Sequence, residues 1–114
     1  MNFVSIILPF YKKKEYIEET ISSVLSQTYQ NFEIIIVYDE VETNNLECIN
    51  LFLKKSNKIK IIVNKKNFGA GESRNIGIEH STGDFIAFID ADDVWHKDKL
   101  EYQIEYMLKN NAQA

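Results

Sequence analysis

Four short apolar runs recur along the chain, separated by longer segments that mix polar and apolar residues. Each run is rich in branched and aromatic side chains and has the length of a strand buried in a sheet. The runs are residues 3–8, 32–38, 59–63 and 85–89. The third contains Lys60, which predicts a place near the sheet edge, and the fourth reads as a strand buried on both faces. Pro9 is expected to end the first strand, because proline cannot donate to the hydrogen-bond ladder.

The segments between these runs have the periodicity of amphipathic helices. Ile17, Ile21 and Val24 recur at intervals of four and three residues, which places them on one face of a helix. Similar patterns predict helices over residues 46–56, 69–80 and 97–108. Strands that alternate with helices of this length form right-handed crossovers and build a parallel sheet. The sequence therefore predicts an α/β fold, with a mostly parallel sheet flanked by helices.

A parallel sheet brings residues that are far apart in the sequence to one edge. Tyr11 follows the first predicted strand, Asp39 follows the second, and Asp90 follows the fourth. Because ligands bind at the carboxyl ends of the strands in such sheets, we expect these residues and the loop 64–71 to line one crevice. Phe10 and Tyr11 point to opposite faces of the first strand, so one of the two is expected in the core.

Asp90, Asp92 and Asp93 place three carboxylates within four positions, directly after an apolar strand. Such carboxylates repel one another unless they share a cation, and hard oxygen ligands suit Mg²⁺ or Mn²⁺. The simpler alternative is a solvated acidic turn in which Asp92 or Asp93 caps the following helix. The three acids alone do not separate these interpretations. The expected crevice favours a metal site that holds a phosphate-bearing ligand.

The segment Gly69-Ala70-Gly71 begins a predicted helix and resembles part of a dinucleotide-binding fingerprint. That fingerprint requires a third glycine at position 74, where this chain has arginine, and it should follow the first strand rather than the third. A Walker phosphate-binding motif is also absent from the sequence. What remains is a helix N-terminus that favours anions, with Arg74 able to bind a diphosphate. Alternatively, Arg74 is a surface residue paired with Glu72 or Glu79.

Length and composition exclude several classes of protein. A chain of 114 residues corresponds to one domain, and its net charge of −4 gives no support to nucleic-acid binding. The single Cys48 cannot form an internal disulfide and favours a reducing compartment. His80 and His96 are too far apart in the sequence to suggest a zinc site. Since no segment approaches the roughly 20 apolar residues of a membrane span, we expect a cytoplasmic protein.

Five motifs, in order and over nearly the whole chain, resemble the amino-terminal, nucleotide-binding half of the family 2 glycosyltransferases, which have the GT-A fold. The motifs are VSIILPFY (4–11), ISSVLSQTY (21–29), FEIIIV (32–37) followed by Asp39, NFG (67–69) with SRNIG (73–77), and GDFIAFIDADDVW (83–95). The resemblance implies a donor-nucleotide-binding portion over residues 1–114 with a truncated, Rossmann-like GT-A fold.

The resemblance also implies roles for individual residues. In the family, a D-x-D element binds Mn²⁺ or Mg²⁺, which bridges the diphosphate of a nucleotide-sugar donor, usually a UDP-sugar. By position, Asp92 and Asp93 are the implied metal ligands, and Asp90 is a ribose or metal contact. Asp39 is implied to meet the base. The remaining nucleotide-binding positions are Pro9, Tyr11, Gly69 and Arg74.

The implied activity is inverting transfer of a sugar to an acceptor hydroxyl of a glycan or a lipid-linked acceptor, in polysaccharide or cell-envelope glycan synthesis. The full-length protein would then work in the cytoplasm, at the inner face of the membrane. In the family, the general base and the acceptor site lie in a second half, beyond residue 114. We therefore expect the chain to be a fragment without a catalytic base, which binds donor but transfers no sugar by itself. An unprotected sheet edge in such a fragment would also favour self-association.

The chain departs from the family after the second strand, where two acids and then Gly-Ser are common. Tyr38 stands in place of the first acid, and Glu40-Val41-Glu42 replaces the Gly-Ser pair. Two other functions compete with the glycosyltransferase interpretation. Asp90-x-Asp92-x-Val94 resembles the motif of aspartyl-phosphate phosphohydrolases, although in those enzymes the motif follows the first strand. The other is a nucleotide-binding module without chemistry, in which the acids only cap a helix.

Overall fold

The computed structural model describes residues 2–110, so Met1 and residues 111–114 of the predicted 1–114 domain lie outside the described residues. Its centre is a four-stranded parallel sheet with the strand order β3-β2-β1-β4. The strands are β1 (Val4–Phe10), β2 (Phe32–Tyr38), β3 (Ile59–Val63) and β4 (Phe85–Phe88). The predicted parallel sheet and the edge position of the third strand are confirmed.

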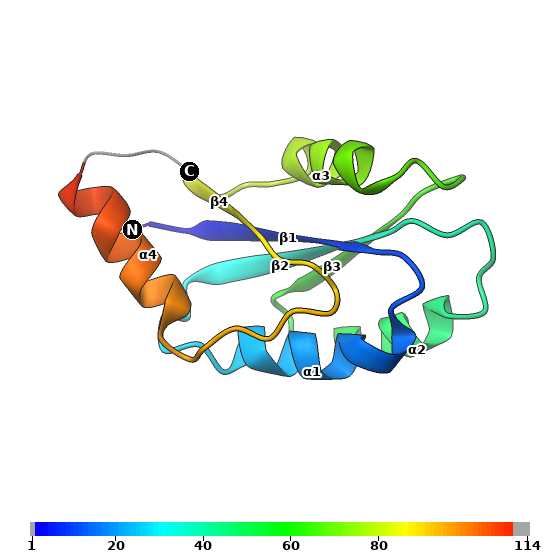
Figure 1. Cartoon of the computed structure of the whole chain (residues 1–114), viewed down its shortest axis with the longest axis horizontal. Coiled ribbons are helices and arrows are strands. Elements are labelled where there is room, and N and C mark those ends of the chain that lie inside the picture. The colour runs from blue at the N-terminus through cyan, green and yellow to red at the C-terminus, as the bar shows by residue number, and fades with distance from the viewer. Residues whose placement is uncertain (1, 111–114) are drawn as a thin grey trace.

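Helices cover both faces of the sheet. They are α1 (Lys14–Leu25), α2 (Leu46–Asn50) with the short 3₁₀ helix η1 (Leu51–Lys54), α3 (Ala70–Glu79) and α4 (Lys99–Lys109). In Figure 1, α1 and α2 lie below the sheet and α3 lies above it, while α4 lies at the left end, where β1 begins. The predicted α/β class is therefore confirmed. None of the helices within residues 2–110 is long and apolar enough to cross a membrane.

The core lies between the central strands and the helices. Every residue of β2 is buried, because the strand has neighbours on both sides and helices on both faces. The predicted stripe of α1 is confirmed, since Ile17, Ile21 and Val24 are buried. Full burial of an apolar side chain of this size contributes about 1.5–3 kcal/mol. This core holds the carboxyl ends of β1 and β2 in place, and the candidate site lies there.

The prediction that Pro9 ends the first strand is wrong, because β1 continues to Phe10. Residues along β1 alternate between bonding to β4 and bonding to β2. The Ile7 carbonyl accepts the Ile89 N–H at 3.1 Å on the β4 side, and the Phe10 carbonyl accepts the Asp39 N–H at 2.9 Å on the β2 side. Pro9, two residues after Ile7, faces the β4 side at a point where β4 has ended. The missing N–H therefore removes no bond to β2.

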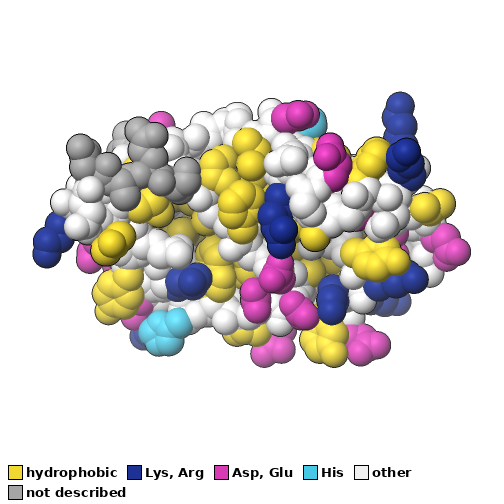
Figure 2. All heavy atoms as spheres, turned by 45° about the horizontal axis from the view of Figure 1, so that its top comes forward, with side chains coloured by type: hydrophobic (Ala, Val, Ile, Leu, Met, Phe, Trp, Pro, Cys, Tyr) yellow, Lys and Arg dark blue, Asp and Glu magenta, His cyan; other side chains and the backbone are white. Residues whose placement is uncertain are grey.

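The prediction that the fourth strand is buried on both faces is also wrong for the described residues. The first three residues of β4 are only half-buried, and Phe88 is 46% exposed. The reason is the place of β4 at an edge, with β1 as its neighbour on one side. Figure 2 shows hydrophobic side chains open to solvent over the middle of the face in view.

Candidate functional site

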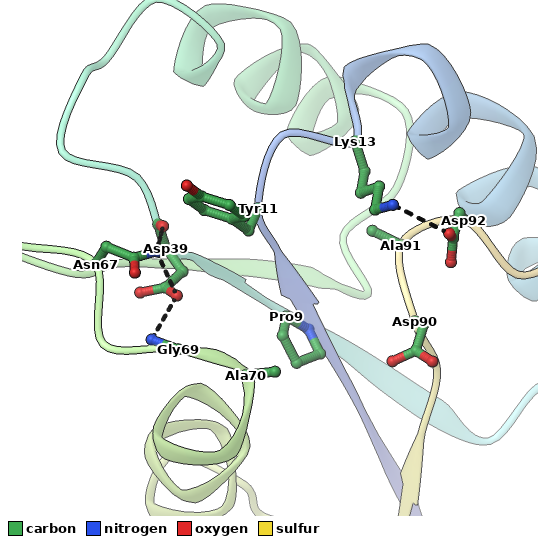
Figure 3. Close-up of a pocket in the computed structure, with 10 residues that line it drawn as sticks. All are labelled: Pro9, Tyr11, Lys13, Asp39, Asn67, Gly69, Ala70, Asp90, Ala91 and Asp92. Atoms are coloured by element: carbon green, nitrogen blue, oxygen red, sulfur yellow. Dashed lines mark hydrogen bonds and ion pairs between the residues drawn. The ribbon is translucent and has the colours of Figure 1, made fainter.

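A pocket of about 460 Å³, here called the main pocket, lies at the carboxyl ends of the strands. Its lining comes from the ends of β1 and β2 and from the segments after β3 and β4 (Figure 3). The lining residues are Pro9, Tyr11, Lys13, Asp39, Asn67, Gly69, Ala70, Asp90, Ala91 and Asp92. The predicted convergence of these four segments is therefore confirmed. The volume is in the range of pockets that hold small-molecule ligands.

Asp39 follows β2 directly and is the most enclosed acid of the pocket, at 1% exposure. Its Oδ1 accepts the Phe68 N–H at 2.7 Å and the Asn64 side-chain amide at 2.9 Å. Its Oδ2 accepts the Gly69 N–H at 2.9 Å and the Asn67 side-chain amide at 3.1 Å. These four bonds match the four lone-pair sites of a carboxylate. The loop between β3 and α3 is thus folded around this one side chain.

Gly69 ends that loop and stands at the N-cap position of α3. Its φ of 91° lies in the region that side chains disfavour, so the turn into the helix requires glycine. The turn brings Ala70, the first residue of α3, to the pocket lining. The N-terminal N–H groups and the dipole of this ten-residue helix favour negative charge at that end of the pocket.

The two aromatic residues at the end of β1 divide between core and pocket, as predicted. Phe10 is fully buried and stacks on Tyr38 with ring centroids 5.7 Å apart, whereas Tyr11 is 46% exposed. The Tyr38 hydroxyl donates to the Glu42 carbonyl at 2.7 Å. Burial raises the pKa of the Tyr38 phenol, and the nearby Glu40 carboxylate raises it further. Tyr38 therefore remains a neutral hydrogen-bond donor.

The three acids after β4 are exposed, and two of them are paired with cations. Asp92 forms an ion pair with Lys13 at 3.2 Å, and both side chains are 42% exposed. Asp90 pairs with Arg74 at 3.4 Å. Figure 2 shows acidic side chains gathered near the middle of this face, with basic side chains around them. Ion pairs this exposed contribute little to stability and can exchange partners.

Two alternatives considered for the acids after β4 and for Arg74 are wrong. Neither Asp92 nor Asp93 caps the next helix, because Asp98 stands at the N-cap position of α4. Arg74 pairs with Asp90 rather than with a glutamate of its own helix. The acidic run therefore lies in a separate loop, five residues ahead of the cap.

The backbone of this loop is firmly attached although its carboxylates are exposed. The buried Ala91 accepts a 2.9 Å bond from the Thr20 hydroxyl at its carbonyl. The Trp95 N–H donates to the Ser23 hydroxyl at 3.1 Å, and the Trp95 side chain is 8% exposed. Both partners belong to α1. The helix thus positions the loop, while the acidic side chains remain open to a ligand.

The acids fit a metal ion only in part. Asp90 and Asp92 line the main pocket, whereas Asp93 does not. Within residues 2–110, no group of three His, Cys, Asp or Glu side chains is close enough to hold an ion alone. Mg²⁺ is usually held in proteins by one or two carboxylates together with substrate phosphates and water. Asp90 and Asp92 would therefore be able to hold a divalent ion only together with other ligands, such as phosphate oxygens and water.

The structure brings most of the residues named from the sequence into one pocket. Those in the lining are Pro9, Tyr11, Asp39, Gly69, Asp90 and Asp92, and those outside it are Arg74 and Asp93. Sequence reasoning did not single out Lys13 among three consecutive lysines. It also gave no role to Asn67, which was visible only as part of a motif. The register of β2 and β3, which pairs Tyr38 with Val63, points to Asn64 as the neighbour of Asp39 and gives no such signal for Asn67.

Comparison with known proteins identifies the family. The profile of Glycosyl transferase family 2 matches residues 5–114, and this chain belongs to that family. It is 40% identical over 111 residues to an uncharacterized glycosyltransferase of Haemophilus influenzae, covering 97% of this chain and 44% of that protein. It is 43% identical over 108 residues to the Escherichia coli UDP-Glc:alpha-D-GlcNAc-diphosphoundecaprenol beta-1,3-glucosyltransferase WfgD, covering 95% of this chain and 42% of that protein. The chain thus spans less than half the length of these relatives.

Solved structures give the same fold. S. aureus TarS in complex with UDP-GlcNAc matches with a TM-score of 0.83 and 28% identity, over 94% of this chain and 31% of that chain. The mannosyltransferase PcManGT of Pyrobaculum calidifontis, in complex with GDP-Man and Mn²⁺, matches with a TM-score of 0.86 over 93% of this chain and 32% of that chain. Its 20% identity supports the fold alone. The predicted GT-A fold is confirmed.

Proposed function

We propose that this chain is the donor-binding part of a glycosyltransferase and that a UDP-sugar binds in the main pocket together with Mn²⁺ or Mg²⁺. The observation that carries the proposal is the arrangement of one pocket between Tyr11 and Asp39 on one side and Asp90 and Asp92 on the other. A base fits the first side and a metal-bound diphosphate fits the second. The names of the E. coli relative and of the S. aureus complex, which carry UDP-Glc and UDP-GlcNAc, support a uridine donor.

On the base side, the exposed Tyr11 ring is placed to pack on a base, with Pro9 and Gly69 in the adjoining walls. Asp39 meets the edge of the base. Its bond from Asn67 is the longest of the four at 3.1 Å, and a base N–H replaces this bond at the least cost. The Asn67 amide keeps its second partner, the Asp39 backbone carbonyl at 2.9 Å.

On the diphosphate side, cations and anions exchange partners when the donor binds. Asp92 and Asp90 would hold the metal ion, and Lys13 and Arg74, which pair with them in this structure, would then be available to the phosphate oxygens. The bound ion supplies a Lewis acid that offsets the charge on the departing nucleoside diphosphate. Each of these groups favours a ligand that carries both negative charge and a metal.

Sugar transfer requires a general base and an acceptor site, which we place beyond residue 114. The acceptor is then a glycan or a lipid-linked molecule of the cell envelope, reached by inverting transfer at the inner face of the membrane. Residues 1–114 alone bind the donor and do not transfer sugar. The open edge of β4 also favours self-association of this chain, which sedimentation velocity over a range of concentrations can test.

Calorimetric titration of UDP into the 114-residue chain tests the donor site. We expect binding with Mn²⁺, binding at least about tenfold weaker in EDTA, and loss of the metal effect in Asp92→Asn. Asp98→Asn, which removes the same charge at the N-cap position of α4, outside the main pocket, serves as the matched control. UDP binding that ignores both Mn²⁺ and Asp92→Asn would support a module without metal chemistry. Transfer of phosphate from a small phosphoester to Asp90 would support the phosphohydrolase.

A further inference from the structure

The loop after β2 contains a buried acid that does not line the main pocket. Glu40 is only 7% exposed, and both of its carboxylate oxygens accept hydrogen bonds. Oε2 accepts the backbone N–H of Lys12 at 2.8 Å, and Oε1 accepts the side-chain amide of Asn45 at 3.0 Å. Glu40 therefore links the turn after β1 to the start of α2. A carboxylate placed so far from solvent needs such partners.

The turn that Glu40 holds has an unusual backbone. Lys12 has a φ of 52°, and it is the one residue other than glycine with a positive φ in the described part of the chain. A side chain makes this left-handed conformation unfavourable, so surrounding contacts must stabilise it. The bond from the Lys12 N–H to Glu40 is such a contact, and its acceptor is charged, which makes it stronger than a neutral bond.

The turn determines where the Tyr11 ring lies. Tyr11 and Asn67 belong both to the main pocket and to a smaller cavity of about 210 Å³, here called the side cavity. The other residues of the side cavity are Lys12, Glu40, Val41 and Glu42. The Lys12 ammonium lies 5.2 Å from the centroid of the Tyr11 ring. The ring thus forms part of the wall between the two spaces, with Lys12 and Glu40 behind it.

We propose that Glu40 is a positioning residue, which holds the left-handed turn at Lys12 and thereby presents Tyr11 to the nucleotide base. Glu40 acts through the turn rather than by touching the donor, since it does not line the main pocket. This gives a role to one residue of the Glu40-Val41-Glu42 segment, in which the chain departs from the family pattern. The inference rests on the proposed function, because the base that Tyr11 would meet belongs to the UDP-sugar.

The test uses one disruptive variant, one matched control and one rescue. Glu40→Ala removes the acceptor of the Lys12 N–H, whereas Glu42→Ala removes the other acid of the side cavity and leaves that bond intact. Lys12→Gly removes the strain of the turn, because glycine adopts a positive φ freely. The readouts are UDP affinity with Mn²⁺ by calorimetry, amide hydrogen exchange at residue 12 by NMR in Mg²⁺, and stability in urea.

We expect Glu40→Ala to weaken UDP binding about tenfold and to speed exchange of the residue 12 amide by at least about tenfold. Glu42→Ala should change UDP affinity less than about twofold. In the Lys12→Gly background, the effect of Glu40→Ala on UDP affinity should fall below about threefold. If Glu40→Ala does not fold, Glu40→Gln replaces it, since the amide still accepts from Lys12 but offers the wrong group to Asn45. Glu40→Gln should also weaken UDP binding and speed exchange of the residue 12 amide, but by less than Glu40→Ala.

Three results would overturn the inference: equal effects of Glu40→Ala and Glu42→Ala, lower stability with unchanged UDP affinity, or an undiminished Glu40→Ala effect in the Lys12→Gly background. A different failure belongs to the proposed function. If the unaltered chain binds neither UDP nor GDP, the donor site is wrong. The exchange at residue 12 and the NMR shifts of the Tyr11 ring then decide the role of Glu40. Unchanged values in Glu40→Ala would contradict it.

Discussion

The two sides of the main pocket carry the same functional group in opposite surroundings. The Asp39 carboxylate is 1% exposed and accepts four hydrogen bonds from one loop. The Asp92 side chain is 42% exposed and has one ion pair, with Lys13. A buried carboxylate with this many donors contributes to folding, whereas an exposed pair contributes little.

This difference separates a part of the pocket that folding fixes from a part that a ligand can rearrange. The base side is built during folding, because Asp39 cannot be satisfied unless the loop between β3 and α3 closes around it. On the metal side, folding fixes only the backbone of the loop after β4, through its hydrogen bonds to α1. The Asp92 carboxylate there has an exposed ion pair with Lys13, which a ligand can replace. If the proposed donor binds here, specificity for its base is separate from affinity for the metal and diphosphate.

The largest expected effect comes from removing the buried acid. Asp39→Ala leaves the Phe68 and Gly69 N–H groups without an acceptor and removes one of the two acceptors of each of the Asn64 and Asn67 amides. We expect the free energy of unfolding to fall by about 3 kcal/mol and nucleotide binding to be lost. Urea denaturation measures the first effect, and Asp92→Ala is the comparison, with an expected change within about 0.5 kcal/mol. Equal losses of stability in the two variants would remove the distinction between the two sides.

A second buried acid on the same strand separates stability from binding. Glu33, near the start of β2, is 4% exposed and accepts bonds from Ser5, Thr82 and Lys60, the last at 2.6 Å. Glu33→Gln should lower the free energy of unfolding by about 1.5 kcal/mol at pH 7, because the amide cannot accept all of these bonds. UDP affinity should stay within about twofold, since Glu33 lies at the other end of the sheet from the main pocket.

The contribution of Glu33 to the free energy of unfolding should also depend on pH. Burial by itself would raise the pKa of Glu33, but the bonds from Lys60, Ser5 and Thr82 outweigh it and hold the pKa below 4.5. A lowered folded-state pKa stabilises the fold above the unfolded-state pKa, and this contribution disappears as the pH falls through the folded-state value. The stability gap between the unaltered chain and Glu33→Gln should therefore narrow below about pH 4.5. A gap that is constant from pH 7 to pH 3 would contradict this explanation.

The smallest expected effects are on the stability of the exposed side. Lys13→Gln should change the free energy of unfolding by less than about 0.5 kcal/mol, because its ion pair with Asp92 is open to solvent. It should still weaken UDP binding about fivefold at low salt, with a smaller difference at high salt, since its proposed role is toward the phosphates. Unchanged UDP affinity at both salt concentrations would remove Lys13 from the phosphate site.

The sequence predicts the fold well because apolar periodicity reports burial within single elements. The strands and helices follow from it, and the parallel sheet then brings Asp39 and Asp90 to one edge. The position of Pro9 inside β1 could not be predicted, because it depends on where β4 ends. The exposure of Phe88 did not follow either, since an apolar run at a sheet edge looks like a buried one.

The candidate site was predictable as a location but not as a set of contacts. Asp39 looks like an ordinary loop acid until Phe68 and Gly69, some thirty residues later, are seen to donate to it. Gly83 belongs to a motif of the sequence, but the motif does not reveal its close contact with β1, where a Cβ on Gly83 would lie 2.6 Å from the Ser5 nitrogen. Contacts of this kind depend on how loops meet, and no local pattern encodes them.

We propose that the main pocket binds the base without a metal and binds the diphosphate with one. NMR titrations of uridine and of UDP, each with and without Mg²⁺, test this most directly, in the unaltered chain and in Asp92→Asn. We predict that uridine causes the same shifts near Tyr11 in all four conditions, while Mg²⁺ strengthens UDP binding by at least about tenfold and only in the unaltered chain. If Mg²⁺ changes the affinities for uridine and UDP equally, or if UDP binds no better with Mg²⁺, the division between the two sides is contradicted.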